Sequence, residues 1–446
     1  MTPHPMYRAH RERLLAELDR RNAAAVLPTN RAKVRNHDAE YRFRADSDFW
    51  WLTGFGEPQS VLVLLPTIGD AKPRSVLFLR EKNREQEIWS GRRLGVERAC
   101  EELGVDQAFP IGELWTRLPD MLKGCSRLVY RAGADEERDR EMFGVLAKLR
   151  GQPRIPQVVP LEVIDPSSVL HELRLFKDEH ELECMRRAAA ITEVAHVAAM
   201  RAARAGVNER EIEALIEYEF RRGGGEGPAY GTIVAGGANA CILHYVQNDR
   251  ALGASDLLLI DAGAEYASYA CDVTRTFPVG GRFGAEQRAL YDVVIGAQLA
   301  AIDATRVGVR FDAVHQVALR KLVEGLCSLG LLQDTPEKAL ESESYKRFYM
   351  HRTSHWLGLD VHDCGAYVVG GLGRALEPRM VLTIEPGLYV AEDDDTVEPR
   401  WRGIGIRVED DVLVREDGVE ILTRAIPKLP GELEQVCARD GAGAAR

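Results

Sequence analysis

The chain has 446 residues, with 58 Lys and Arg against 69 Asp and Glu, so its formal net charge is −11 and its length allows two or three domains. The acidic balance is spread along the chain, which argues against a nucleic-acid or anionic-membrane partner because such partners need a basic face. No segment reaches the roughly 18 consecutive apolar residues of a membrane span, no secretory signal is evident, and eight scattered cysteines without a CxxC pair favour a reduced, cytoplasmic protein.

The first third of the chain predicts alternating helices and strands. Leu14, Leu15 and Leu18 recur at helical spacing and predict an opening amphipathic helix. Short apolar runs predict strands at residues 23–27, 60–65, 75–79 and 127–130. Strands separated by helices are typical of a small α/β domain.

A proline-rich stretch follows this domain. It contains four prolines within fourteen residues, namely Pro153, Pro156, Pro160 and Pro166. Proline lacks the backbone N–H that helices and central strands require, so this stretch interrupts both. We therefore expect a domain boundary in this region, which divides the chain into residues 1–170 and 171–446.

Two capped helices open the second domain. Asp178 with Glu181 three residues later is the pattern of a helix N-cap, and it predicts a long helix that ends near Arg204. Asn208 with Glu211 repeats the pattern before a second helix. The apolar strand 256–260 follows.

A similar order of elements recurs about one hundred residues later. AARAGV at 202–207 returns as ATRVGV at 304–309, between helices predicted at about 285–304 and 311–329. In each half an apolar strand then ends in an acid, in LLLIDAG at 257–263 and in VLTIEPG at 381–387. The order of elements indicates an internal duplication with pseudo-twofold symmetry.

Four carboxylates mark the ends of these strands. Asp261 and Glu385 end the two apolar strands, and Asp272 and Glu409 lie on a further strand in each half. If the halves face each other, the four converge, and their mutual repulsion raises the pKa of each. A pair of divalent cations would remove that repulsion.

Histidines near these acids complete a possible metal site. His351, His355 and His362 lie in HRTSHWLGLDVHDCG, and His244 lies in ILHYVQND. The zinc motif HExxH is absent because Arg352 stands where it needs glutamate. Four carboxylates and one imidazole form a hard ligand set that suits Mn²⁺ and two-metal hydrolysis. Each feature also has an ordinary interpretation, since a histidine can belong to a core and an acid can form a turn.

Seven segments in order carry a specific resemblance. They are RNHDAEYRFRADSDFWWLTGF, EIWSGRRLG, ILHYVQND, LIDAGAEYASYACDVTRTFPV, HRTSHWLGLDVHDCG, VLTIEPGLYV and GIGIRVEDDV. Together they resemble the aminopeptidase P branch of the pita-bread metallopeptidases over nearly the whole chain. The resemblance implies an α/β (α+β) fold, with a creatinase-like N-terminal domain that serves oligomerisation and the substrate channel. The C-terminal domain would be a pseudo-twofold pita-bread catalytic domain.

The resemblance also implies a metal centre. Two metals, usually Mn²⁺ in this branch, would be bound by Asp261, Asp272, His355, Glu385 and Glu409. Asp272 and Glu409 would bridge them, and Glu385 would also serve as general base toward the attacking water.

Other positions receive supporting roles from the same resemblance. His244 and His362 would donate hydrogen bonds to the transition state, while His351 would line the proline side of the pocket. Asp38 and Arg407 would connect to the metal cluster, with Tyr230 close to it. Trp89 would reach the substrate channel across a subunit contact, which implies a homo-oligomer, a tetramer or a dimer.

The implied substrate is a peptide with proline at position two, cleaved after its first residue. Prolidase, which accepts only dipeptides, and a non-catalytic peptide-binding relative remain alternatives. Methionine aminopeptidases lack the N-terminal domain, and the creatinase branch acts without metals, so both are disfavoured. The chain departs from the expected pattern at Arg352 and Thr353, where Gly-Leu is usual, and GTIVAGGANA at 231–240 lacks a common acid.

Overall fold

A computed structural model describes residues 5–151 and 157–438 of the chain. The chain forms two compact units, Met1–Arg174 and Leu175–Arg446. Pro153 and Pro156 of the predicted boundary lie outside the described residues. Within the described ranges, none of the helices combines the length and the apolar character needed to cross a membrane.

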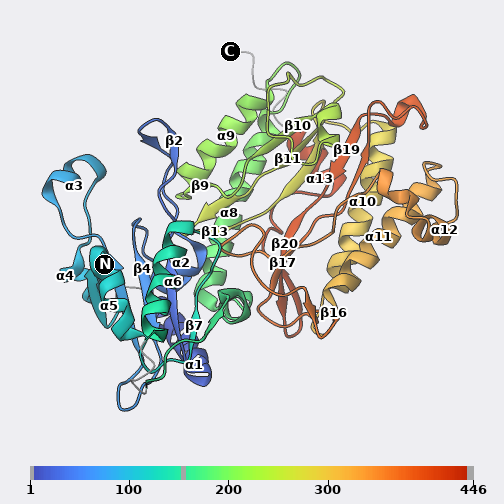
Figure 1. The fold of residues 1–446 in the computed structure, drawn as a ribbon. Helices are drawn as coiled ribbons and strands as arrows, with labels where there is room; N and C mark the ends of the chain where they lie inside the picture. Colours follow the sequence, from blue (N-terminus) through green and yellow to red (C-terminus); the bar gives the residue numbers. More distant parts are fainter. Residues whose placement is uncertain (1–4, 152–156, 439–446) are drawn as a thin grey trace. The chain divides into compact units, whose positions relative to one another are not determined.

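The N-terminal unit is built on a mixed six-stranded sheet (Figure 1). Its strands, in spatial order, are β6 (Gln107–Pro110), β5 (Arg74–Leu79), β4 (Val61–Leu65), β1 (Ala23–Pro28), β7 (Arg127–Val129) and β8 (Glu162–Ile164). The strands predicted at 23–27, 60–65, 75–79 and 127–130 are confirmed within two residues. Because β8 pairs with β7, the chain returns to this sheet between Pro160 and Pro166.

Helices cover the sheet because its central strands are apolar on both faces. All five residues of β4 are buried. The predicted opening helix is α1 (Pro5–Arg21), which contacts β1 and β4, and α2 (Ser47–Thr53) also contacts β1. On another side, α5 (Leu114–Met121) and α6 (Glu136–Arg150) share a core cluster with strand residues such as Val63 and Phe78.

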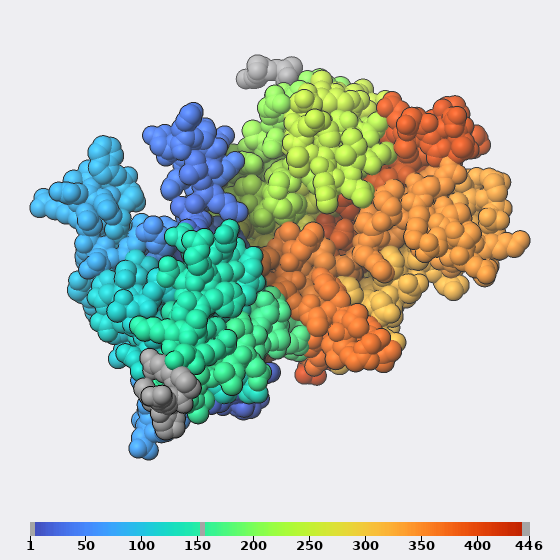
Figure 2. All heavy atoms as spheres, in the orientation of Figure 1, coloured from blue at the N-terminus to red at the C-terminus, as the bar shows by residue number. Residues whose placement is uncertain are grey.

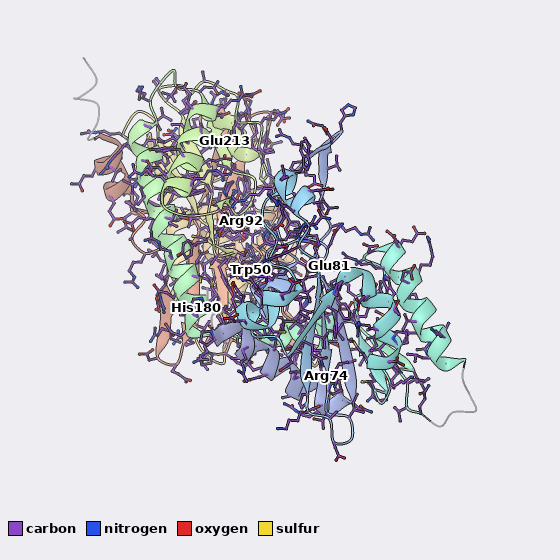
Figure 3. All side chains as sticks on the ribbon, turned by 90° about the vertical axis from the view of Figure 1, so that its left-hand side faces the viewer. Trp50, Arg74, Glu81, Arg92, His180 and Glu213 are labelled. Atoms are coloured by element: carbon purple, nitrogen blue, oxygen red, sulfur yellow. The ribbon has the colours of Figure 1, made fainter. Side chains whose placement is uncertain are left out.

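Two segments of the N-terminal unit project from this body. They are the hairpin of β2 (Val34–Asn36) and β3 (Ala39–Glu40), and the short helix α3 (Arg84–Ser90) (Figures 1 and 2). α3 has no buried residue. By contrast, Trp50 of α2 and Arg74 of β5 belong to the compact part of the unit (Figure 3).

The C-terminal unit contains the predicted duplication. Its first half consists of α8 (Glu179–Ala202), α9 (Glu209–Arg222) and the sheet β10 (Ile233–Gly236), β11 (Leu257–Asp261) and β14 (Thr274–Pro278). Its second half consists of α10 (Ala285–Ala304), α11 (Phe311–Ser328) and the sheet β17 (Val381–Ile384), β20 (Asp410–Arg415) and β21 (Gly418–Ile421). Each half therefore pairs two packed helices with a three-stranded antiparallel sheet.

The helix starts follow from the predicted caps. The Asp178 carboxylate accepts from the backbone N–H of Glu181 at 3.0 Å, and the Glu181 carboxylate accepts from the Asp178 N–H at 2.9 Å. Asn208 and Glu211 form the same capping box at α9. Figure 3 marks the two helices by His180 on α8 and Glu213 on α9. These reciprocal bonds satisfy backbone donors that a helix start otherwise leaves unpaired.

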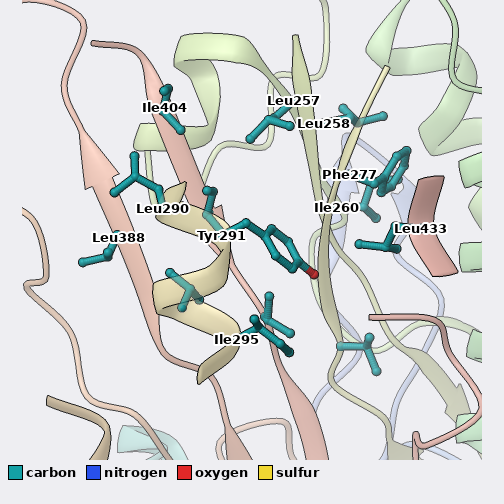
Figure 4. Close-up of a cluster of buried hydrophobic side chains, with 14 of the residues drawn as sticks. Leu257, Leu258, Ile260, Phe277, Leu290, Tyr291, Ile295, Leu388, Ile404 and Leu433 are labelled. Carbon is teal, nitrogen blue, oxygen red and sulfur yellow. The ribbon is translucent and has the colours of Figure 1, made fainter. Parts of the chain in front are cut away.

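A large apolar cluster holds the two halves of this unit together (Figure 4). Leu258 and Phe277 from the first sheet lie in the same cluster as Leu290 and Tyr291 of α10. Strand β18 (Gly387–Val390) adds Leu388, which is fully buried. The cluster fixes the strands, and their polar ends are therefore held in defined positions.

Candidate metal centre

In both halves of the C-terminal unit, the acids lie where one strand ends and its partner strand begins. Asp261 is the last residue of β11 and pairs with Thr274, so the segment that carries Asp272 lies beside it. In the second half, Glu385 directly follows β17 and Glu409 directly precedes β20. Because each pair of strands is antiparallel, the end of one strand meets the start of its partner. Each half thus presents two carboxylates at one end of its sheet.

Direct contacts join the carboxylates of the two halves. The Glu409 N–H donates to the Thr274 carbonyl at 3.1 Å, and the Thr274 hydroxyl donates to Oε2 of Glu409 at 2.7 Å. The Asp272 N–H donates to Oδ2 of Asp411 at 3.1 Å. Thr274 of the first half therefore positions Glu409, and the Asp411 side chain of the second half holds the backbone of Asp272.

Three predicted ligands form a tight group. One ligand atom each from Asp272, His355 and Glu409 lies within 4.8 Å of the others. Nε2 of His355 is 3.3 Å from Oδ2 of Asp272 and 3.6 Å from Oε1 of Glu385. Asp261 lies in the same pocket. The structure thus brings together all five residues predicted as metal ligands.

These carboxylates are buried or half-buried and crowd one another. Burial, reinforced by neighbouring acids, raises the pKa of Asp272 and holds the pKa of Glu409 well above its ordinary range. Burial also raises the pKa of Glu385 to about 7, although the nearby His355 opposes the rise. Water-excluded carboxylates that repel each other are stabilised when a cation lies between them. The donor set, rich in oxygen with one imidazole, fits divalent cations.

His355 is oriented toward the acids by its second nitrogen. Its Nδ1 lies 3.0 Å from the carbonyl of Trp356, which can only accept, so Nδ1 carries the hydrogen and Nε2 faces the carboxylates. Burial lowers the pKa of His355, but the hydrogen bond and charge of Asp272, with that of Glu385, outweigh it and raise the pKa to about 9.

A buried hydrogen-bond network supports Asp261. Arg407 donates from Nη2 to Oδ2 of Asp261 at 2.6 Å, and the Tyr230 hydroxyl donates to Oδ1 at 2.6 Å. Arg407 also donates from Nη1 to the Tyr389 hydroxyl at 2.9 Å, and that hydroxyl is 2.9 Å from Nε2 of His351. Burial lowers the pKa of Arg407, but Tyr389 and Asp261 raise it well above its ordinary value.

The cluster lies in a pocket of about 910 Å³. Its lining includes every predicted site residue of the C-terminal unit: Tyr230, His244, Asp261, Asp272, His351, His355, His362, Glu385, Arg407 and Glu409. The His362 ring meets the His355 ring edge-on at 4.4 Å, and burial lowers the pKa of His362. Apolar side chains such as Leu243, Phe311 and Val361 line the remaining wall.

Two predicted site residues belong to the N-terminal unit. Asp38 is exposed in the turn between β2 and β3. Trp89 lies on α3 with a side chain that is 90% exposed. Their predicted roles stay predictions.

Sequence reasoning missed several polar residues of the site. Tyr389 lies two residues after Gly387 in a recognised motif, but only the pairing of β18 with β19 (Ile404–Arg407) brings it to Arg407. Thr353, one of the departures, is buried, and its hydroxyl lies 2.8 Å from Nδ1 of His315 and 2.7 Å from the Tyr349 hydroxyl. Its carbonyl also accepts from the Glu385 N–H at 2.8 Å. No sequence signal identified His315, which lies on α11.

Comparison with known proteins agrees with this site. The profile of metallopeptidase family M24 matches residues 183–416, and that of the aminopeptidase P N-terminal domain matches residues 7–130. The Xaa-Pro aminopeptidase of Escherichia coli is 43% identical over 95% of this chain and 96% of its own, and that of Haemophilus influenzae is 41% identical over 97% of each. The solved aminopeptidase PepP of Pseudomonas aeruginosa is 44% identical, with a TM-score of 0.94 over 98% of this chain and 99% of its own. A zinc-substituted E. coli aminopeptidase P with bound product is 42% identical, with a TM-score of 0.93 over 97% and 98%.

Proposed function

Because the chain belongs to metallopeptidase family M24 and carries the N-terminal domain of the aminopeptidase P type, we propose that it is an Xaa-Pro aminopeptidase. It hydrolyses the bond between the first residue of a peptide and a proline at position two. The observation that carries this conclusion is the group of buried Asp272 and Glu409 with half-buried His355, in a pocket that also contains Glu385.

Two divalent cations, for which Mn²⁺ is our proposed identity, would be held in this pocket by Asp261, Asp272, His355, Glu385 and Glu409. Carboxylates and one imidazole suit Mn²⁺ better than a thiolate-rich site would. When bound, such ions polarise a carbonyl and lower the pKa of a water molecule.

The chain's own residues then handle the proton and the peptide. Glu385, whose Oε1 lies 3.6 Å from Nε2 of His355 in the same pocket, accepts the proton of the attacking water. His244 and His362 donate hydrogen bonds to the oxygen on which charge develops. Arg407 and Tyr230 hold Asp261 in place through their 2.6 Å contacts.

The substrate has an unusual bond. The nitrogen of an Xaa-Pro bond carries a ring and no hydrogen, so its recognition depends on the shape of the ring. His351 and the apolar wall of the pocket offer a surface for that ring.

Exposed residues of the N-terminal unit support assembly into a dimer or tetramer. Ile88 and Trp89 on α3 are 76% and 90% exposed, and a large exposed apolar pair often marks an interface. Trp89, and Asp38 on the neighbouring hairpin, complete the substrate channel and the network around the cations in the assembled enzyme.

All eight cysteines lie in the described part of the chain and none forms a disulfide, which supports a cytoplasmic location.

Substrate cleavage and metal content test the function together. We expect the Mn²⁺-loaded protein to contain two ions per chain and to release arginine from Arg-Pro-Pro. Cleavage of Gly-Pro alone would make the protein a prolidase. A protein that retains no metal and cleaves neither peptide would be a peptide-binding relative, and the proposed function would be wrong.

A further inference from the structure

A buried ion pair joins the start of the C-terminal unit to the loop that carries the site histidines. Lys177, between α7 (Leu170–Leu175) and the cap of α8, donates from Nζ to Oδ2 of Asp363 at 2.9 Å. The two side chains are only 1% and 2% exposed. A buried ion pair gains little net stability over apolar residues of similar size, because both charges lose their hydration. Stability alone therefore does not explain this pair.

Asp363 connects the pair to the metal-binding imidazole. It directly follows His362, and its N–H donates to the Trp356 carbonyl at 2.9 Å. The same carbonyl lies 3.0 Å from Nδ1 of His355. A movement of Asp363 would therefore move the acceptor that orients the His355 ring. The His362 ring would move with it, since it packs on His355 at 4.4 Å.

A second contact reaches the strand that delivers Asp272. The Gly358 carbonyl accepts from the Ala270 N–H at 2.8 Å, two residues before Asp272. A Cβ at position 358 would overlap Oδ2 of Asp363 and lie 3.0 Å from Cε of Lys177. Only glycine lets the loop pass this close to the ion pair. The same pair thus fixes the loop against the Asp272 segment.

We propose that Lys177 and Asp363 are positioning residues, which hold His355 and Asp272 at the mutual geometry that the metal centre requires. The pair fixes the loop 355–363 on one side, and the backbone contact with Ala270 fixes it on the other. This inference rests on the proposed function, because it assigns the pair to the proposed metal site. Partners of ligating histidines typically change metal affinity or activity by about 10- to 100-fold when removed.

The test removes the pair without leaving a buried charge. We would compare the wild-type protein with the variant that combines Lys177→Met and Asp363→Asn, both of similar size to the natural residues. Calorimetric titration of the metal-free proteins with Mn²⁺ should show affinity about 10- to 100-fold weaker in the double variant. We expect its metal-free melting temperature to stay close to that of the wild type, and its kcat for Arg-Pro-Pro to fall at saturating Mn²⁺.

The single variant Lys177→Met separates positioning from folding. It removes the buried ammonium group that the Asp363 carboxylate contacts, so we expect a lower melting temperature. Adding Asp363→Asn should restore the melting temperature and leave Mn²⁺ affinity weak. If the pair were purely structural, the double variant would regain both the melting temperature and the Mn²⁺ affinity of the wild type. That result would overturn the proposal.

A more exposed ion pair on the same unit serves as control. Arg186 on α8 contacts Glu420 on β21 at 2.8 Å, with both side chains 28% exposed. Arg186→Gln with Glu420→Gln should leave Mn²⁺ affinity unchanged. Wild-type affinity in the Lys177 and Asp363 double variant would refute the positioning role alone. A wild-type protein that binds no Mn²⁺ would instead refute the proposed metal centre.

Discussion

Buried carboxylates lie among cationic side chains in the N-terminal unit and among other acids in the C-terminal unit. In the N-terminal unit, Asp48 of α2 is 4% exposed and is surrounded by cationic partners. In the C-terminal unit, Asp272 and Glu409 are 6% and 2% exposed and lie among other acids. Burial has the same cost in both places, so the difference lies in which part of the system supplies the compensating positive charge.

The N-terminal unit supplies that charge from its own side chains. Asp48 accepts from Nη1 of Arg174 at 2.6 Å and from Nη2 of Arg131 at 2.9 Å, and Nε2 of His171 lies 3.3 Å away. Burial raises the pKa of Asp48, but His171 and Arg174 outweigh this effect and hold it well below its usual range. This carboxylate ties α2 to α7 and completes a structural contact.

The C-terminal unit leaves its acids without enough cations. Arg407 pairs with Asp261, yet burial and repulsion raise the pKa of Asp272, Glu385 and Glu409. A fold that retains repelling acids at a pocket is suited to bind cations there. Where a buried acid has protein cations it is structural, and where it lacks them it is a candidate ligand.

The largest expected effect follows from removing the proposed base. Glu385→Ala should lower kcat for Arg-Pro-Pro by about 10³-fold, because general-base catalysis contributes about 10²- to 10⁴-fold and a metal ligand is lost as well. Initial-rate measurements at saturating Mn²⁺ would show it, with circular dichroism to confirm an intact fold. Near-normal turnover in this variant would refute the assignment.

Removing Asp48 tests the buried acid that is paired with cationic side chains of its own unit. Asp48→Ala removes the buried carboxylate that Arg174 contacts at 2.6 Å, so we expect the free energy of unfolding of the N-terminal unit to fall by about 3–5 kcal/mol. Denaturant unfolding monitored within that unit measures the change, and added Mn²⁺ should not reverse it. Asp120→Ala, at an exposed pair with Lys123, is the control and should change stability little.

Neutralising an acid of the metal centre should raise the free energy of unfolding of the metal-free protein, whereas Asp48→Ala should lower it for the N-terminal unit. Asp272→Asn removes repulsion from the metal-free cluster, so we expect the metal-free protein to gain about 1–2 kcal/mol while Mn²⁺ binding is lost. Thermal melts with and without chelator would measure both effects.

A matched control lies on the same unit. Asp410 is buried but paired with Arg275 at 2.8 Å and with Lys428 at 2.6 Å. Asp410→Asn should therefore destabilise the protein. If Asp272→Asn and Asp410→Asn changed the stability of the metal-free protein in the same direction, the distinction between acids with and without protein cations would fail.

The smallest expected effect is on pH dependence. Glu385 has a pKa of about 7 when folded and of about 4.3 in an unfolded chain, so the metal-free folded protein binds more protons between these values. Its stability should therefore fall as pH rises from about 4.3 to 7. His355 acts in the same direction, since its pKa of about 9 gives stability that is lost as pH rises toward 9.

A substitution should reduce this dependence. Metal-free melting temperatures at pH 5, 6, 7 and 8 would show the fall in the wild type, and Glu385→Gln should make it shallower, with the contribution of His355 left. Asp48 gives the opposite pH dependence of stability. Because its pKa is lowered in the folded protein, its contribution is present above about pH 3.9 and is lost in acid. An equal slope in the Glu385→Gln variant would show that Glu385 is not the titrating group.

Much of the architecture follows from local patterns in the chain. Asp178 with Glu181, and Asn208 with Glu211, predict helix starts because a cap depends only on residues a few positions apart. The two units divide between Arg174 and Leu175, and strand β8, which lies within the proline-rich stretch, pairs with β7 of the N-terminal sheet. Strand pairing depends on residues far along the chain, so no local signal reports it.

The sequence by itself determined which residue types could form the site and the order in which they occur. Alternating elements, two strand-end acids per half and the histidines of HRTSHWLGLDVHDCG are local properties, readable from spacing and from family resemblance. Only the tertiary structure decided how they meet. The 2.7 Å contact from Thr274 to Glu409, the Tyr389 link between Arg407 and His351, and the Lys177–Asp363 pair join residues far apart in the chain. Such contacts arise from the packing of two halves around one core, which fixes distances that the chain order leaves free.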